Sequence, residues 1–93
     1  MIKSFADRET ERIYRGAQSR RFPVAIQARA RICLERLDAV THPSDLAAFP
    51  AMRLKRLKGS MRGRYSLRVN DQYRIVFHWN DGNAGNVRLM DYH

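Results

Sequence analysis

Two neighbouring stretches of alternating side chains, residues 64–69 and 73–79, constrain the fold of this chain more than any other feature. Alternate residues of a strand point to opposite faces, so each stretch predicts a strand with one apolar face. Those apolar positions are Tyr65, Leu67, Val69, Tyr73, Ile75, Phe77 and Trp79. A loop of residues 70–72 keeps the apolar faces together, whereas a slip of one residue would turn one whole set to the opposite face. The sequence therefore predicts an antiparallel hairpin with Leu67 opposite Ile75.

The same register places Arg68 opposite Arg74 on the polar face of the hairpin. Like charges at opposed positions destabilise a sheet by a few tenths to about 1 kcal/mol, so the pair suggests that an anion binds between or above them. Two solvated arginines that lean apart are the alternative interpretation. Lys58, Arg62 and Arg64 come from the adjoining strand and turn. Because they add positive charge nearby, they favour a phosphate site.

Two helices are predicted in the first forty residues. Asp7 can cap the first helix, and Gly16 is a natural stop after it. Pro23 suits the first turn of the second helix. The apolar stripe of this helix consists of Ile26, Ala30, Cys33, Leu34, Leu37 and Val40, at helical spacing. The segment 41–43 ends it, because the residue before a proline avoids the α conformation.

Four further segments complete the expected elements. Residues 1–5 are expected to form an edge strand, residues 54–57 a ragged strand, residues 80–86 a turn-rich loop and residues 87–91 the last strand. A helical half followed by a β half predicts an α+β fold, with two N-terminal helices packed on a small twisted antiparallel sheet. A chain of 93 residues makes one domain, residues 1–93.

The balance of charge narrows the possible partners. The formal net charge is +9, and the segment from Arg53 to Arg74 contains eight basic residues and one acidic residue, Asp71. Such a field attracts polyanions, namely nucleic acid, a membrane surface or an acidic protein. Arginine outnumbers lysine, which favours bidentate recognition of phosphate. A solvated basic face with no dedicated partner is the alternative.

Nothing in the sequence indicates export or a membrane. No apolar run approaches the roughly 20 residues that span a bilayer, and the N-terminus lacks the apolar region of a signal peptide. Cys33 has no second cysteine with which to form an internal disulfide, and its helical neighbours favour a small buried core residue. His42 is expected to be an exposed linker residue, not a ligand. We therefore expect a cytoplasmic protein.

Four segments together resemble the HigB-type toxins, also called plasmid maintenance killer proteins, of the RelE/ParE superfamily. They are Met1–Phe5, Leu57–Gly59, Tyr65–Phe77 and Asp91–His93, and the resemblance runs along nearly the whole chain. It implies a RelE-like fold and a type II toxin that cleaves mRNA on the translating ribosome. It also implies a HigA-like helix-turn-helix antitoxin as partner. The toxin would then bind operator DNA only through this antitoxin. Residues 42–52 match less well, and Tyr73 stands where many relatives carry Trp.

The resemblance also implies where the site lies. By position, the family's catalytic pattern falls on Lys58, Arg74, Asp91, Tyr92 and His93. Arg68 is implied as a neighbour of this pattern. The basic residues that we expect to contact RNA are Arg68, Arg62, Arg64 and Lys55.

These residue types suit RNA cleavage in which the 2′-hydroxyl attacks the adjacent phosphate. The reaction needs a base for the hydroxyl, cations for the charge growing on the phosphate and an acid for the leaving oxygen. Asp91 or His93 could be the base and His93 or Lys58 the acid, and the choice stays open. Arg74 with Lys58 would hold the phosphate, and a nucleobase could stack on Tyr92. A merely polar chain end is the alternative interpretation of residues 91–93.

No metal or other cofactor is expected, because the only acidic residues beyond residue 40 are four Asp and no His/Cys spacing forms a metal site. Two other functions stay open. The same fold could poison gyrase, as in the ParE branch, although the acid–base tail disfavours this. The chain could also be a non-enzymatic basic RNA-binding module.

Overall fold

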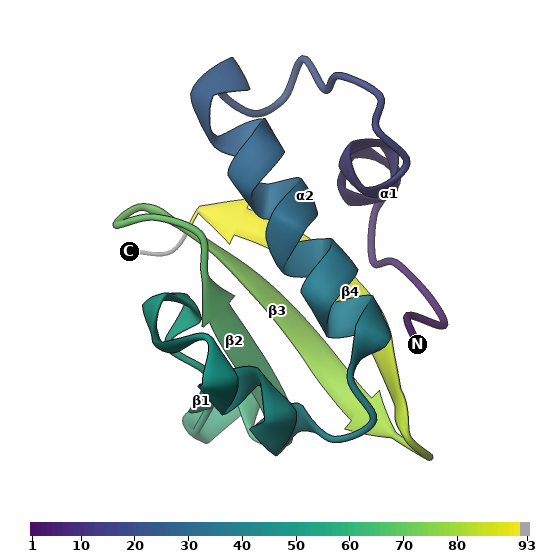
Figure 1. The fold of residues 1–93 in the computed structure, drawn as a ribbon, viewed down its shortest axis with the longest axis vertical. Coiled ribbons are helices and arrows are strands. Elements are labelled where there is room, and N and C mark those ends of the chain that lie inside the picture. Colours follow the sequence, from purple (N-terminus) through teal and green to yellow (C-terminus); the bar gives the residue numbers. More distant parts are fainter. Residues whose placement is uncertain (92–93) are drawn as a thin grey trace.

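The computed structural model describes residues 1–91 and has a helical layer on one face of an antiparallel sheet (Figure 1). The α-helices are α1 (Arg8–Tyr14) and α2 (Val24–Ala39), and the short 3-10 helices are η1 (Pro43–Ala48), η2 (Pro50–Met52) and η3 (Gly59–Met61). The strands are β1 (Lys55–Arg56), β2 (Arg64–Arg68), β3 (Tyr73–Asn80) and β4 (Asn83–Asp91), paired in the order β1-β2-β3-β4. The predicted α+β class is confirmed. The 3-10 helices add to the two N-terminal helices, and η3 follows the first strand.

The β2–β3 hairpin has the predicted register. Leu67 lies opposite Ile75, and the Val69 N–H donates to the Tyr73 carbonyl at 2.9 Å. Within the connecting loop, the Asn70 side-chain oxygen accepts from the backbone N–H groups of Gln72 and Tyr73, at 2.9 and 2.7 Å. An Asn side chain at the start of a turn can replace the backbone acceptor in this way. The three-residue loop is therefore stabilised by its own first residue.

The β3–β4 hairpin differs from the prediction. Asn80 pairs with Asn83, so the turn contains only Asp81 (φ 51°) and Gly82 (φ 77°). Two positive φ angles in a two-residue turn match the twist of the flanking strands. The prediction of a loop over residues 80–86 was wrong for residues 83–86, because β4 already begins at Asn83. Asn86 (φ 49°) instead lies in a bulge, where the register shifts and the strand continues.

Both predicted helices are present, and their ends follow local chemistry. The Asp7 carboxylate accepts from the Thr10 N–H at 2.7 Å and caps α1, and Gly16 (φ 87°) follows the end of that helix. Helix α2 ends at Ala39, before the predicted stop. His42 is exposed, as expected, and its N–H donates to Asp45 at 3.1 Å at the start of η1.

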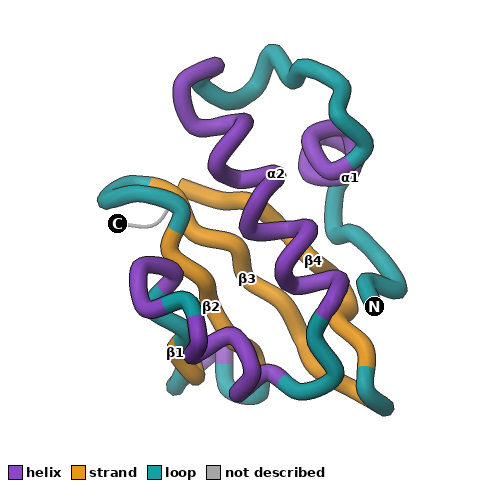
Figure 2. The backbone as a smooth tube through the Cα atoms, in the orientation of Figure 1, coloured by secondary structure: helices purple, strands orange, loops and turns teal. Residues whose placement is uncertain are grey.

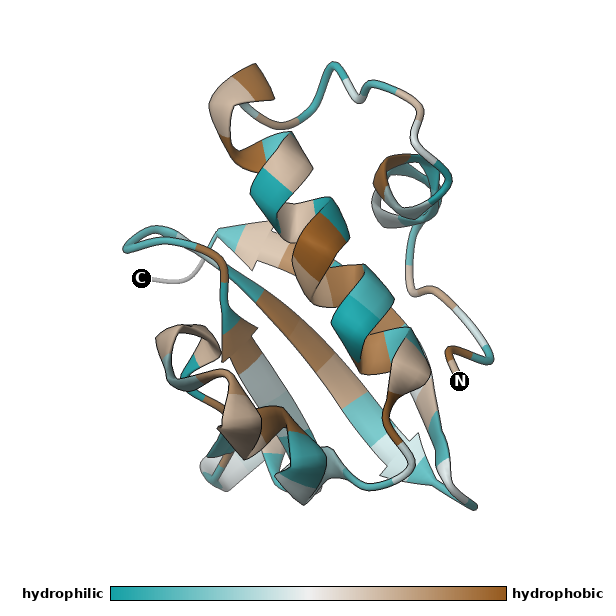
Figure 3. Cartoon of the chain, viewed as in Figure 1, coloured by the Kyte–Doolittle hydropathy of each residue, from teal (hydrophilic) through white to brown (hydrophobic). Residues whose placement is uncertain are grey.

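The core lies between α2 and the inner face of the sheet, where the brown segments of Figure 3 meet. The predicted stripe of α2 is buried from Ile26 to Leu37, and Val40 is half-buried beside it. Sheet residues of the same core are Leu67, Val69, Ile75, Phe77, Val87 and Leu89. Cys33 belongs to this core, and burial raises the pKa of its thiol. The prediction of a buried, structural cysteine is confirmed.

The N-terminal segment covers the outer edge of β4 (Figure 2). Ile2 and Phe5 form isolated parallel bridges with Ala84 and Val87, in place of the regular edge strand that was predicted. Further along β4, the Leu89 N–H donates to the Thr10 hydroxyl at 3.0 Å. Covered edges do not recruit other strands, so this side of the sheet is closed. The opposite edge is β1, a strand of two residues where a ragged strand was expected.

Candidate nucleic-acid interface

The sheet face that points away from α1 and α2, called the outer face below, is strongly basic. Paired residues of adjacent strands share a face, and the register aligns Lys55, Ser66, Val76 and Arg88 in one row across the sheet. The adjacent rows place Arg68, Arg74 and Met90 on one side and Arg64 with His78 on the other. The basic residues on this face are Lys55, Arg64, Arg68, Arg74 and Arg88. All four strands therefore contribute cations to one surface.

Arg68 and Arg74 face each other, as predicted, but each has a partner within the chain. Arg68 forms an ion pair with Asp71, and Arg74 Nη1 donates to the Ser66 hydroxyl at 3.2 Å. Hydrogen bonding to Arg68, together with its charge, lowers the pKa of Asp71. Asp71 offsets the like-charge repulsion that led us to infer an anion between the arginines. The facing pair can thus be explained without an anion, and the anion site inferred from it stays a prediction.

Asp91 lies at the end of β4, opposite Tyr73 and next to the pair formed by Arg74 and Met90. The Gln72 amide donates to its carboxylate at 3.0 Å, so the β2–β3 loop holds the side chain. Met90 shares the outer face with Arg74, and β4 ends at Asp91, where the last strand was predicted to end. Tyr92 and His93 lie outside the described residues, and their predicted roles stay predictions.

Lys58 and Arg62 flank η3, the turn between β1 and β2. The Leu57 N–H donates to the Arg64 carbonyl at 2.9 Å, which places Lys58 beside the start of β2. Lys58 is exposed and lines a pocket of about 380 Å³ with Lys55, Arg56, Leu57, Ser60 and Met61. The register places Lys55 and Arg64 on the outer face, while Arg68 and Arg74 lie toward its other end. Asp91 lies at that same end of the sheet, in the row of Tyr73 next to that of Arg74.

Sequence reasoning missed two residues of the outer face. Ser66 is completely buried and holds Arg74 through its hydroxyl. Arg88, which was not among the residues expected to bind RNA, lies 3.8 Å from the Asp7 carboxylate. Both pair with Val76, which lies two residues after Arg74 and so points to the same face. The alternation of side chains along the strands could therefore have identified them. Among residues 1–91, no group of three or more His, Cys, Asp or Glu side chains lies together.

Solved structures identify the class of protein that has this fold. The structure of a YoeB–YefM complex from Staphylococcus aureus matches with a TM-score of 0.63 and 17% identity, over 100% of this chain and 98% of that chain. A YoeB/ParE toxin from Agrobacterium tumefaciens matches with a TM-score of 0.52 and 16% identity, over 96% of this chain and 99% of that chain. The chain thus shares the fold of these YoeB and ParE structures. None of its helices within residues 1–91 is long and apolar enough to cross a membrane.

The family is narrower than the fold. Residues 3–93 match the family model of the RelE-like toxin of the type II toxin–antitoxin system HigB. Toxin HigB-1 of Vibrio cholerae is 39% identical over 90 residues, which cover 96% of this chain and 95% of that protein. The chain therefore belongs to the HigB-like toxin family, and the resemblance noted from its sequence is confirmed.

Proposed function

We propose that this toxin is an endoribonuclease that cleaves mRNA on the translating ribosome. The observation that carries the proposal is the basic outer face, with Arg74 braced by Ser66 at the end of the sheet where Asp91 is held. Such a surface attracts the phosphodiester backbone of RNA, and a carboxylate at the same end of the sheet as a fixed cation could take part in proton transfer at a bound phosphate. Membership of the HigB-like family supports the same activity.

The proposed reaction is an internal transesterification that needs no metal. The 2′-oxygen forms a bond to the adjacent phosphorus and loses its proton to a base, Asp91 or His93. The bond from phosphorus to the 5′-oxygen breaks, and an acid, His93 or Lys58, protonates that oxygen. The products are a cyclic 2′,3′-phosphate and a 5′-hydroxyl. Arg74 and Lys58 would stabilise the charge on the phosphate.

Other residues would bind the message without reacting. Tyr92 would stack on a nucleobase, and the RNA contacts proposed for the outer face and its turn are Lys55, Arg62, Arg64 and Arg68. These cations lie on the surface of a sheet, so the ribosome would fix the path of the message across it. Positioning of this kind can supply a large part of a rate enhancement. Dependence on the ribosome also means that the toxin would act in the cytoplasm.

The partner that silences the toxin is proposed to be a helix-turn-helix antitoxin of the HigA kind. The YoeB–YefM structures from Staphylococcus aureus are toxin–antitoxin complexes, which supports an antitoxin partner for this chain. The net charge of +9 would speed encounter with an acidic partner surface. Operator DNA would be bound only through the antitoxin.

Induced expression followed by mapping of mRNA 5′ ends tests the proposed function. We expect new 5′ ends within codons of translated messages, and little cleavage when purified toxin meets naked RNA. An Arg74→Ala variant, expressed to the same level, controls for the stress of expression. Intact messages with broken DNA would favour a gyrase poison, and intact messages with no growth defect would favour an RNA-binding module.

A further inference from the structure

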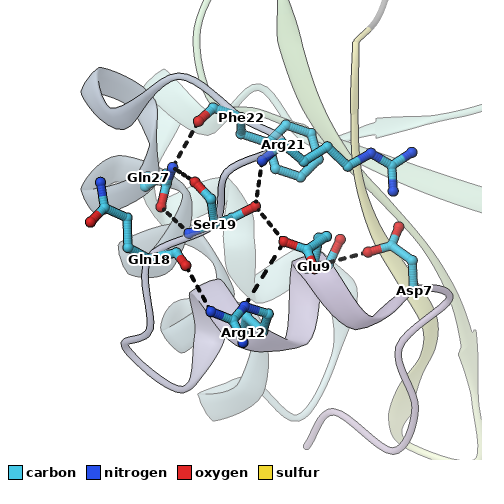
Figure 4. Close-up of polar contacts among 9 residues, drawn as sticks. Asp7, Glu9, Arg12, Gln18, Ser19, Arg21, Phe22 and Gln27 are labelled. Carbon is cyan, nitrogen blue, oxygen red and sulfur yellow. Dashed lines mark hydrogen bonds and ion pairs between the residues drawn. The ribbon is translucent and has the colours of Figure 1, made fainter.

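A second cluster of cations lies away from the outer face, where α1 meets its connection to α2 (Figure 4). A pocket of about 420 Å³ is lined there by Glu9, Arg12, Gln18, Arg20 and Arg21, and is called the arginine pocket below. Three of these side chains are guanidinium groups and only one is a carboxylate. The pocket therefore has a net positive charge.

The backbone of this connection is fixed by a buried glutamine. Gln27 Nε2 donates to the carbonyls of Ser19 and Phe22, at 2.7 and 2.8 Å, and its Oε1 accepts from the Ser19 N–H at 2.9 Å. Ser19 and Gln27 are only 2% and 9% exposed. One side chain of α2 thus clamps both ends of the segment that contains Arg20 and Arg21, as Figure 4 shows. A fixed backbone reduces the conformational entropy lost when a ligand binds.

The hydrogen bonds of the pocket leave its positive charge dominant. Glu9 Oε1 accepts from the Ser19 hydroxyl at 2.7 Å and lies 3.9 Å from Arg12 Nε. Arg12 also donates to the Gln18 carbonyl at 3.1 Å, which orients its guanidinium. The Arg21 guanidinium lies over the Phe22 ring, 5.6 Å from the centroid. Oriented guanidinium groups match the geometry of phosphate oxygens.

Aromatic contacts link the arginine pocket to the end of the sheet that holds the proposed site. The Phe22 ring meets the Tyr73 ring edge-on, with centroids 5.8 Å apart. Tyr73 lies opposite Asp91 in the β3–β4 pair, and Arg74 follows it on the outer face. The segment that carries Arg20 and Arg21 therefore lies beside the end of the sheet that holds Asp91 and Arg74.

We propose that the arginine pocket binds backbone phosphates of RNA and forms a docking contact separate from the cleaving surface. The proposal rests on the proposed function, because the RNA would be either the message itself or ribosomal RNA beside it. Both present the same phosphodiester chemistry. RNA is favoured over an acidic protein segment because the cations of the pocket are all arginines and the pocket lies beside the sheet end that would receive the message.

Binding of wild-type toxin is compared with that of an Arg20→Gln/Arg21→Gln variant. The control variant, Arg8→Gln/Arg29→Gln, removes the same charge from exposed residues that do not line the pocket. The probes are a short single-stranded 2′-O-methyl RNA, which lacks the attacking hydroxyl, and ribosomes programmed with a 2′-O-methyl message. Circular dichroism verifies that each variant is folded. In a plot of log affinity against log salt concentration, we expect the slope of the pocket variant to be smaller in magnitude than that of wild type by roughly 1.4. This is about 0.7 for each of the two phosphates that the variant no longer neutralises.

The two probes identify the source of the phosphates. Loss of slope on both probes assigns them to the message, and loss on ribosomes alone assigns them to ribosomal RNA. Equal losses in the pocket and control variants would overturn the proposal, since diffuse charge would then explain the binding. A pocket variant that binds both probes like wild type would also overturn the proposal. The same holds if the variant weakens only a complex with an acidic protein. Toxin that binds but never cleaves a 2′-hydroxyl message on ribosomes would contradict the nuclease function and leave the pocket standing.

Discussion

Arg74 lies between Arg68 and Met90 on the outer face and is held by Ser66. If it stabilises the charge of the transition state, Arg74→Ala should lower the cleavage rate by roughly 10²- to 10³-fold, as the loss of one such donor does elsewhere. Single-turnover cleavage on programmed ribosomes measures this. An Arg8→Ala variant on α1 should keep full activity. A drop in RNA affinity with an unchanged cleavage step would assign Arg74 to binding alone.

Asp91 tests the acid–base part of the mechanism. Asp91→Asn keeps an oxygen that can accept from the Gln72 amide but removes the negative charge. Loss of a general base should reduce the rate by about 10²- to 10⁴-fold, with little change in stability. Cleavage kinetics and thermal unfolding are measured together. Full activity in this variant would leave His93 as the candidate base.

Asp71 would compete with phosphate for Arg68 if Arg68 contacts RNA as proposed. The ion pair lowers the pKa of Asp71, so this carboxylate stays charged at neutral pH and would lose its charge only in acid, below its ordinary range. Asp71→Asn should therefore release Arg68 and tighten RNA binding at neutral pH. The salt plot should steepen by about 0.7 if the released Arg68 neutralises one more phosphate. Unchanged affinity and slope would show that Arg68 does not bind RNA.

Among the elements, the β3–β4 hairpin depends most visibly on backbone conformation. Gly82 has φ 77° with nothing within 4 Å of an added Cβ, so Gly82→Ala should cost about 1 kcal/mol of the free energy of unfolding through strain alone. Gly85 lies in the same hairpin without a positive φ, and an added Cβ would meet Ser4 Oγ at an ordinary 3.5 Å. Gly85→Ala should therefore be near neutral. Urea unfolding measures both, and equal costs would contradict the turn geometry.

The two sheet hairpins also show which elements a sequence can predict. The β2–β3 register followed from parity, because burial of one face excludes a slip of one residue. The tight turn of the β3–β4 hairpin and the early start of β4 were missed because Gly85 and Asn86 are typical of loops. Here they lie within a bulged strand, and the Asn86 N–H is bonded to Ser4, 82 residues away. Local composition cannot anticipate such a distant partner.

For the whole molecule, the layered fold separates a helical surface from the basic outer face (Figure 1). On α2, Val24 and Ile32 are 66% and 47% exposed, unusual values for apolar side chains. If the antitoxin covers this helix, Ile32→Glu should weaken the complex and the rescue of growth without reducing toxicity. The control is Ala48→Glu, on an exposed residue of η1. Co-purification and growth assays with the co-expressed antitoxin measure both effects, and full rescue of Ile32→Glu would place the antitoxin elsewhere.

Side-chain period and turn chemistry in the sequence determined the α2 stripe, the β2–β3 hairpin and the α1 cap. Each of these depends on residues within a few positions of one another, and the burial of one face selects a single register. Parity also indicated Arg68 and Arg74 as a facing pair, and the family resemblance marked the terminal residues.

Only the tertiary structure decided how these parts are held. Phe22 meets Tyr73, Thr10 accepts from Leu89, and residues 1–5 lie along β4. The packing of α2 also buries Gln27, whose hydrogen bonds fix the backbone of the segment between α1 and α2 that lines the arginine pocket. Contacts of this kind join distant residues, or depend on a burial that no local period encodes. They form because packing leaves each buried donor and acceptor only a few partners within reach.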